Sequence, residues 1–289
     1  MKHPLSTMVR QAARLALTLA ALAWGVAATA QPTAPLLFAV SEGTSGGGSA
    51  VTDEQMATKY RPVVEVMERV LGQKITVRYV RDFRMLEDGM KNARFDLVIA
   101  RPSDYPARGL RDYGYNVVTT TQPDGHCLLV VKEDSPFQTL AEMKGKRFIM
   151  PEQIAYMTKF CMAELRDQGL PLTPGEVTFV REQGAIPFAL KNNLSHIGGI
   201  ASYSGVAGRL QKEGLRVLHK SRPQPYLPLI AGARIPADKV RELGAELVAL
   251  SKTEQGAKAL AAIGLKGFDT NSQQRLLELL EWLGDKKAN

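Results

Sequence analysis

Residues 94–105, RFDLVIARPSDY, place a strand directly before a group of polar residues. Leu97 to Ala100 is an unbroken apolar run, which is typical of a strand buried on both faces of a parallel sheet. The run ends at a cation and two hydroxyls, Arg101, Ser103 and Tyr105. In open α/β sheets, ligands lie just beyond the carboxyl ends of parallel strands. We therefore expect these three side chains to face a ligand.

The alternation of strands and helices extends on both sides of this stretch. Apolar strands are expected at 36–40, 74–80 and 95–100, with helices at 59–71 and about 83–90 between them. The pattern starts again with strands at 126–132, 146–150, 177–180, 197–201 and 215–219 and helices at 155–168 and 186–191. Three helices close the chain, at 237–250, 254–263 and 273–283. Strands alternating with helices are typical of sheets covered by helices on both faces.

This order predicts an α/β protein of two lobes, each a mostly parallel sheet flanked by helices, with two hinge crossings between them. Residues 31–125 and 223–289 would form the first lobe, and residues 126–222 the second. The proline-rich stretch 221–232 would be an extended linker returning across the hinge. A cleft between two such lobes is a common place for a small ligand.

The first 30 residues have the pattern of a secretory signal peptide. A basic head with Lys2, Arg10 and Arg14 precedes an apolar run from Leu15 to Val26, and residues 28–30, ATA, resemble a signal-peptidase site. We expect cleavage before residue 31 and a periplasmic protein. The alternative is an uncleaved membrane anchor, although the run is shorter than the roughly 20 residues of a membrane span.

Charge and motifs restrict the classes of function. Without the three basic residues of the leader, 34 Lys and Arg face 29 Asp and Glu, and the charges are interspersed. The absence of a basic block argues against nucleic acid, and the small positive excess favours a small anionic ligand. The sequence has no nucleophile elbow and no metal-binding motif, so we expect no enzymatic activity and no cofactor.

The candidate ligand-binding residues are those that follow strands or lie at the crossing. Arg81 and Arg101 could present paired donors to an oxyanion, or could instead form surface ion pairs with neighbouring carboxylates. The start of the helix at 155 could add free backbone N–H groups. The full candidate set is Ser41, Arg81, Asp82, Arg101, Ser103, Tyr105, His126, Tyr156, Thr158, Gln183 and Ser202.

The two cysteines, Cys127 and Cys161, have a spacing that matches no zinc or haem motif. Exported proteins tend to pair their thiols, so a disulfide is one expectation. Two buried, inert thiols, or a thiol that contacts the ligand, are the alternatives, and the sequence leaves this choice open.

Several motifs, in order, resemble the phosphonate/phosphite-type periplasmic substrate-binding proteins, which have the type 2 periplasmic binding protein fold. In residues 60–105 the resemblance rests on Tyr60, Pro62, Leu71, Gly72, Asp96, Pro102 and Tyr105, and in residues 132–148 on Asp134, Ser135, Leu140, Lys144, Gly145 and Lys146. The segment SRPQPYLP and the closing helices also fit. The chain departs from the family where EQIAYMTKF replaces a Ser-Thr-Ser-Gly turn and where His196 replaces an aspartate, so the family's oxyanion residues do not carry over.

The resemblance implies a two-lobed receptor that closes around a small molecule and passes it to a membrane partner, commonly an ABC-type permease. We also expect the protein to be a monomer. A receptor that signals to a membrane sensor kinase is the alternative within the same fold. Two readings from other classes stay open at this point. One is a periplasmic enzyme that uses Arg101 and His126, and the other is a structural protein whose cleft is filled by side chains.

Overall fold

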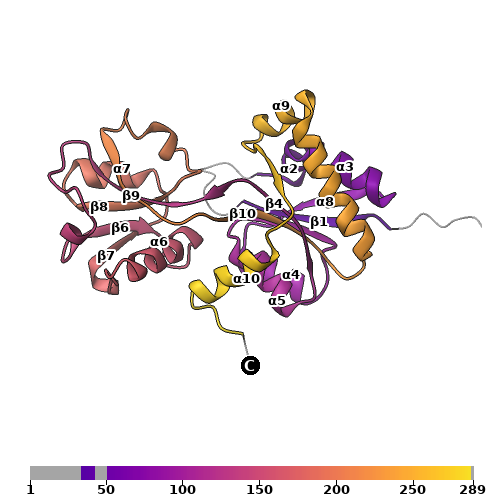
Figure 1. Cartoon of the computed structure of the whole chain (residues 1–289), viewed down its shortest axis with the longest axis horizontal. Coiled ribbons are helices and arrows are strands. Elements are labelled where there is room, and N and C mark those ends of the chain that lie inside the picture. Colours follow the sequence, from indigo (N-terminus) through magenta and orange to yellow (C-terminus); the bar gives the residue numbers. More distant parts are fainter. Residues whose placement is uncertain (1–33, 43–50, 288–289) are drawn as a thin grey trace, which may run out of the picture. The chain divides into compact units, whose positions relative to one another are not determined.

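The strands form two sheets, described here from a computed structural model that covers residues 34–42 and 51–287. The first sheet has the order β11-β4-β10-β3-β1-β2 and the second the order β7-β6-β8-β5-β9 (Figure 1). The strands of the first sheet are β1 (Leu36–Ser41), β2 (Ile75–Tyr79), β3 (Leu97–Ala100), β4 (Asn116–Gly125), β10 (Gln224–Ala231) and β11 (Gly267–Asp269). Those of the second are β5 (Cys127–Lys132), β6 (Phe148–Pro151), β7 (Val177–Val180), β8 (Ile197–Ala201) and β9 (Leu215–Lys220).

Parallel pairing is confined to three neighbouring strands in each sheet. The ladders β1–β2, β1–β3, β6–β7 and β6–β8 are parallel, and the other ladders of the described residues are antiparallel. The α/β fold with two sheets and two crossings is confirmed, but the sheets are mixed and not mostly parallel in their pairing. The reason lies in the connections: parallel neighbours need a helical crossover, whereas β10 enters directly from the other sheet and runs antiparallel to β3 and β4.

The chain passes from the first sheet to the second between Gly125 and Cys127 and returns between Lys220 and Gln224. The stretch after the return, expected as a linker, is strand β10, and all eight of its residues are buried. Pro225 and Pro228 lie where the register of the β10–β4 ladder shifts. Because proline donates no hydrogen bond, it is tolerated in a sheet at such irregular positions.

Nine α-helices cover the sheets within the described residues. They are α2 (Asp53–Lys59), α3 (Arg61–Leu71), α4 (Phe83–Lys91), α5 (Asp104–Asp112), α6 (Tyr156–Asp167), α7 (Ala185–Lys191), α8 (Ala237–Lys252), α9 (Glu254–Ala262) and α10 (Gln273–Trp282). The apolar stripe of α3 was predicted, and Gly72 ends this helix at a φ of 65°. Helix α5 was missed because Pro106 and Gly109 look like helix breakers. A Cβ at Gly109 would lie 2.7 Å from Ile230 Cδ1, so glycine lets α5 pack on β10 without displacing this side chain.

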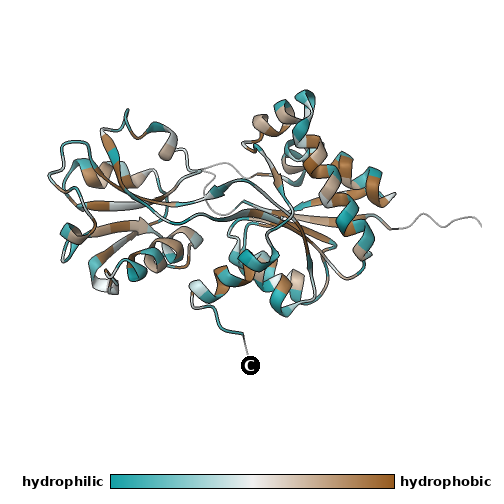
Figure 2. Cartoon of the chain, in the orientation of Figure 1, coloured by the Kyte–Doolittle hydropathy of each residue, from teal (hydrophilic) through white to brown (hydrophobic). Residues whose placement is uncertain are grey.

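Helices lie on both faces of each sheet. On the first sheet, α3 and α8 share one buried cluster, and α4 shares another with β3. On the second, α6 and α7 contribute to separate clusters. Helix α10 follows β11 of the first sheet, yet its buried leucines belong to the same cluster as Phe160 and Cys161 of α6. Figure 2 shows the apolar residues concentrated on the strands and on one side of the helices.

The chain divides by its internal contacts into Met1–Ala34 and one compact unit, Pro35–Asn289. The predicted signal peptide, residues 1–30, lies outside the described residues, as does the glycine-rich segment 43–50. Within the described ranges, none of the helices has the length and apolar character needed to cross a bilayer.

Candidate functional site

A cavity of about 340 Å³ lies where strands of both sheets end. Its first-sheet residues follow β1, β2 and β3, and its second-sheet residues end or follow β6, β7 and β8. The lining consists of Glu42, Phe83, Arg101, Pro102, Pro151, Ala155, Tyr156, Met157, Arg181, Glu182, Gln183, Gly184, Tyr203, Ser204, Gly205, Val206 and Arg209. This is the position that the strand-end rule predicts for a ligand.

Three candidates from the sequence line this cavity: Arg101, Tyr156 and Gln183. The Gln183 side chain is oriented by its Oε1 atom, which accepts a hydrogen bond of 2.9 Å from the backbone N–H of Ala201 at the end of β8. Its amide nitrogen remains available as a donor. Contact of these side chains with a ligand stays a prediction.

Arg101 is largely committed to protein partners. Its Nε donates to the carbonyl of Glu42 at 2.5 Å, and Nη1 donates to the Tyr226 hydroxyl at 2.9 Å. The guanidinium carbon lies 5.5 Å from the centre of the Tyr203 ring. These contacts join the ends of β1, β3 and β10. The arginine therefore shapes the cavity wall, and only part of its donor capacity remains for a ligand.

Glu42 is the carboxylate of the first-sheet wall, and its side chain is 12% exposed. Lys59 Nζ lies 2.6 and 2.7 Å from its two oxygens, and the Tyr60 hydroxyl donates to Oε1 at 2.6 Å. Burial raises the pKa of Glu42, but the hydrogen bonds from Lys59 and Tyr60 and the charge of Arg101 outweigh burial and hold the pKa below its ordinary value. Glu42 is thus ionised and already neutralised by neighbouring cations.

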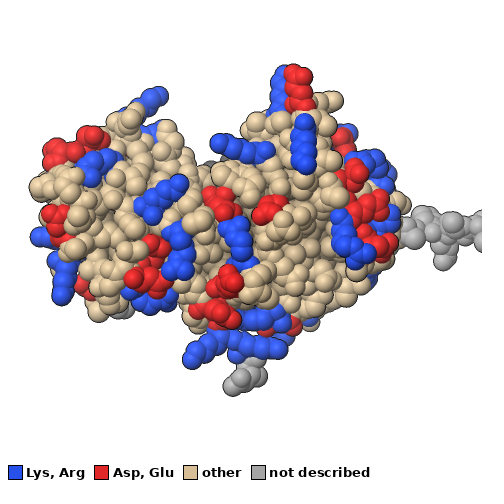
Figure 3. Space-filling model, in the orientation of Figure 1, with Lys and Arg blue, Asp and Glu red and all other residues tan. Residues whose placement is uncertain are grey.

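Two arginines on the second-sheet side of the cavity differ from Arg101 in their exposure and in their partners. Arg181 follows β7, and Arg209 ends a short 3-10 turn after β8. Both are exposed, and neither forms an ion pair with a residue that the structure describes. Figure 3 shows acidic and basic side chains interspersed over the face in view.

Helix α6 follows β6, which lies between β7 and β8 in the second sheet, and its first residues line the cavity. Its N-cap residue, Ala155, supplies no side-chain hydrogen bond, so the first N–H groups of the helix are not capped by it. The Tyr156 side chain is 5% exposed, and its hydroxyl has no hydrogen-bond partner among the described residues. The nearby Ser103 hydroxyl donates elsewhere, to the carbonyl of Pro225. Burial raises the pKa of Tyr156 well above its ordinary value, so the hydroxyl stays a donor.

Three other candidates are buried and do not line the cavity. Ser103 Oγ donates 2.8 Å to the Pro225 carbonyl and so fixes the start of β10. Thr158 Oγ1 donates 2.9 Å to the carbonyl of Pro151 at the end of β6. Ser41 is fully buried in β1, and its hydroxyl has no partner within the described part of the chain. The hydroxyls of Ser103 and Thr158 therefore have structural roles that explain their positions.

Arg81, Asp82 and Tyr105 also lie outside the lining. Asp82 caps α4 by accepting a hydrogen bond of 3.0 Å from the Met85 N–H, and Arg81 is exposed beside it. The cap directs the next residue, Phe83, to the cavity instead. The Tyr105 ring stacks on Phe83 with centroids 5.2 Å apart. Of the two arginines predicted to pair around one oxyanion, Arg101 lines the cavity and Arg81 does not, and their joint contact with a ligand stays a prediction.

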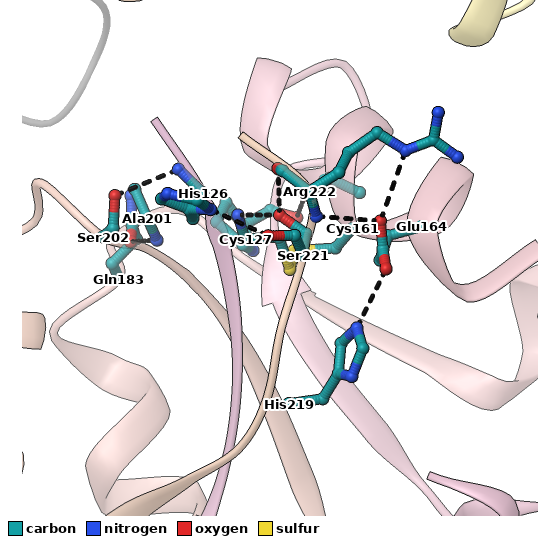
Figure 4. The surroundings of a disulfide bond; sticks show 12 residues. His126, Cys127, Cys161, Glu164, Gln183, Ala201, Ser202, His219, Ser221 and Arg222 are labelled. Atoms are coloured by element: carbon teal, nitrogen blue, oxygen red, sulfur yellow. Dashed lines mark hydrogen bonds and ion pairs between the residues drawn. A yellow bond between two sulfur atoms is a disulfide. The ribbon is translucent and has the colours of Figure 1, made fainter. Parts of the chain in front are cut away.

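His126 lies in the first crossing, and Ser202, which follows β8, is hydrogen-bonded to it (Figure 4). Ser202 Oγ accepts from the His126 N–H at 3.0 Å, and His126 Nδ1 lies 2.8 Å from the carbonyl of Ser221 in the second crossing. Ser221 Oγ in turn accepts from the N–H of Cys127 at 2.9 Å. These bonds hold the two crossing segments side by side, outside the cavity.

Cys127 and Cys161 form a disulfide, which the sequence left open. It joins the start of β5 to α6, and both residues are fully buried. One turn further along α6, the buried Glu164 accepts from the Arg222 N–H at 3.3 Å and lies 2.9 Å from His219 Nε2 (Figure 4). Helix α6 is therefore fixed to both crossings, which positions the end that lines the cavity.

The candidate set omitted several residues of the lining: Glu42 and Tyr203, which were recognised at strand ends but not selected, and Arg181 and Arg209. Glu42 and Arg181 directly follow strands β1 and β7, so the strand-end signal that selected Ser41 and Gln183 applies to them equally. Arg209 carries no such signal because it lies eight residues beyond β8. Among the described residues, no cluster of three or more His, Cys, Asp or Glu side chains could hold a metal ion.

Comparison with solved structures shows the fold. XAC2383 from Xanthomonas citri bound to ATP superposes with a TM-score of 0.65 at 16% identity, covering 86% of this chain and 97% of that one. PhnD1 from Prochlorococcus marinus in complex with methylphosphonate gives 0.64 at 12% identity, with 88% and 100% covered. The binding protein PA3383 of an ABC phosphonate transporter from Pseudomonas aeruginosa gives 0.60 at 13%, with 87% and 86% covered.

Comparison with sequences gives the family. A search of curated protein sequences finds no match. The family model described as "ABC transporter, phosphonate, periplasmic substrate-binding protein" matches residues 49–276, more than three quarters of the chain. The resemblance drawn from the motifs is thus confirmed. The chain belongs to the phosphonate-type periplasmic substrate-binding proteins of ABC transporters and is a periplasmic solute-binding protein.

Proposed function

We propose that the protein binds a small anionic solute in the cavity between the two sheets and delivers it to an ABC-type permease. The observation that carries this proposal is the pair of exposed arginines, Arg181 and Arg209, at a cavity whose one deeply placed carboxylate, Glu42, is already neutralised. An anion would compensate the two cations. A cationic solute would face them with only Glu182 in its favour.

The start of α6 supports an anion independently of the arginines. The N-terminus of a helix carries a positive partial charge and free N–H groups, and both favour negative ligands. The Tyr156 hydroxyl, which is buried without a partner among the described residues, is a further donor on a residue of the cavity lining. An unmet buried donor costs free energy in the empty protein, and a ligand oxygen would remove that cost.

The cavity takes its residues from both sheets, which suits a receptor that closes on its ligand. A solute that touches Phe83 and Arg101 on one side and Arg181 and Gln183 on the other has more contacts when the two walls are close together. Such a ligand shifts the protein toward the closed state by its differential affinity. The structures that share this fold include complexes with methylphosphonate and ATP, both of them anions.

The test is a thermal-shift screen of oxyanions, carboxylates, neutral metabolites and amines, followed by calorimetry on the leading compound. A ligand that binds only the native state raises the melting temperature by mass action. We expect anions to give the largest shifts and the double variant Arg181→Ala, Arg209→Ala to lose at least about tenfold in affinity. Arg241→Ala, an exposed arginine on α8, is the matched control and should leave affinity unchanged. A neutral or cationic compound as the strongest ligand would overturn the proposal.

Delivery to a permease has its own test. Deleting the gene should abolish cellular uptake of the labelled solute. Normal uptake combined with a lost transcriptional response to the solute would instead assign the protein to a sensor kinase.

A further inference from the structure

We propose that the ligand class is an organic anion with one acid group on an apolar body about the size of a ring, and not an inorganic oxyanion or a methyl-sized acid. This inference rests on the proposed anion binding and concerns what else the cavity recognises. Three features support it: the placement of the cations, the nature of the opposite wall, and the size of the cavity.

The cations lie on one side of the cavity. The second sheet has the order β7-β6-β8, and α6 starts after the central strand β6. Arg181 follows β7, Arg209 ends the 3-10 turn after β8, and both line the cavity together with Ala155 and Tyr156 at the start of α6. An acid group at this end would meet two guanidinium groups and the first N–H groups of the helix. The geometry accommodates a single acid group well.

The opposite wall does not suit a second acid group. Lys59 and Tyr60 there are bonded to Glu42, and the Arg101 guanidinium is bonded to Glu42 and Tyr226, so these donors and cations are already used within the protein. The remaining first-sheet residues of the lining are Phe83 and Pro102, both apolar. Phe83 is held in place by its stacking on Tyr105. A ligand with its acid group at α6 would therefore present an apolar body to Phe83 and Pro102.

The size of the cavity fits the same class. At about 340 Å³ it falls within the roughly 300 to 1,000 Å³ of pockets that bury organic molecules, where apolar lining with a few polar groups is typical. A tetrahedral oxyanion at the α6 end would leave the aromatic part of the lining in contact with water. An apolar body would remove that surface from water, which favours binding in proportion to the area buried.

The experiment is calorimetric titration of the mature protein with two matched series. Phosphate, methylphosphonate and phenylphosphonate keep the acid group and enlarge the body, whereas benzoate, benzenesulfonate and benzyl alcohol keep the ring and vary the head. We expect phenylphosphonate to bind at least about tenfold more tightly than methylphosphonate, and phosphate to bind most weakly. We expect benzyl alcohol to bind at least about tenfold more weakly than the ring acids.

Two variants connect the ring to its wall. Phe83→Ala should reduce the preference for phenylphosphonate over methylphosphonate to threefold or less, while the affinity for methylphosphonate changes little. Met85→Ala, two residues along the same helix, is the control, because Met85 is 66% exposed and outside the lining. It should leave the preference intact.

The outcomes separate the two proposals. If methylphosphonate or phosphate binds as tightly as phenylphosphonate, the ligand class is wrong and anion binding stands. If Met85→Ala removes the preference as strongly as Phe83→Ala, the assigned wall is wrong and the class proposal fails with it. If no acid binds at millimolar concentration, or benzyl alcohol equals the acids, the proposed function fails too.

Discussion

Removing the Cys127–Cys161 disulfide should destabilise the protein by a predictable amount. The two residues are 34 positions apart in sequence. In the chain-entropy description, a cross-link that closes a loop of this length stabilises the fold by about 4 kcal/mol. For a chain of this size, about 2 to 4 °C of melting temperature corresponds to each kcal/mol, so the expected loss is roughly 8 to 16 °C.

Reduction and substitution both remove the cross-link, but substitution also removes two buried sulfurs. Both cysteines are fully buried, and Gly199 packs against the Cys161 sulfur, where a Cβ would come within 3.0 Å. The double variant Cys127→Ala, Cys161→Ala loses this packing as well as the loop constraint, so it should be destabilised at least as much as the reduced protein. Calorimetric melting of oxidised protein, reduced protein and the double variant measures the effect. Reductant should not change the double variant, which serves as the control.

Two results would refute this account. Equal melting temperatures for oxidised protein and the double variant would mean that the cross-link contributes nothing. Two titratable thiols in the denatured, unreduced protein would mean that the bond does not form.

Three further changes test the assignments at the site. The pKa of Glu42 is depressed, so its ionised form stabilises the fold above about pH 4.5, and this contribution is lost as the pH falls through the lower folded-state pKa. Glu42→Gln should therefore make the free energy of unfolding fall less steeply as the pH is lowered. An unchanged decrease with pH, measured by urea titrations, would contradict this. Tyr156→Phe should leave the empty protein as stable or stabilise it by about 1 kcal/mol, yet weaken anion binding severalfold by calorimetry; undiminished affinity would show that the hydroxyl does not contact the ligand. Ser103→Ala should cost about 1 kcal/mol of stability through the lost bond to Pro225, with ligand affinity unchanged in the same titration.

The local pattern of the sequence was sufficient for the general position of the candidate site. Periodicity placed the buried strands and the α3 stripe, and the strand-end rule pointed to the region of Arg101, Tyr156 and Gln183, which line one cavity. This works because a parallel strand and its following helix are specified by short-range features. The carboxyl ends of neighbouring parallel strands then lie at the same edge of the sheet, and this does not depend on how the rest of the protein packs.

Which neighbour at each strand end reaches the cavity depended on tertiary structure. Arg81, Asp82 and Phe83 were all recognised at the end of one strand, but the candidate set kept the first two, whereas Asp82 caps α4 and Phe83 lines the cavity. Ser103 was chosen, but the carbonyl of Pro225, more than a hundred residues away in sequence, takes its hydroxyl. A side chain at a strand end has several partners in reach, and a single sequence does not rank them.

The sequence by itself determined the α/β class, the two crossings and the family, since each follows from local periodicity and from motifs in order. Tertiary structure decided that residues 224–231 form a central strand and that the cysteines pair. It also decided that Arg101 is bonded to other groups of the protein, whereas Arg181 and Arg209 have no ion-pair partners among the described residues. The physical reason is range. Secondary structure is set by neighbours a few residues apart, whereas a strand's place in a sheet and a side chain's partner depend on contacts between distant segments.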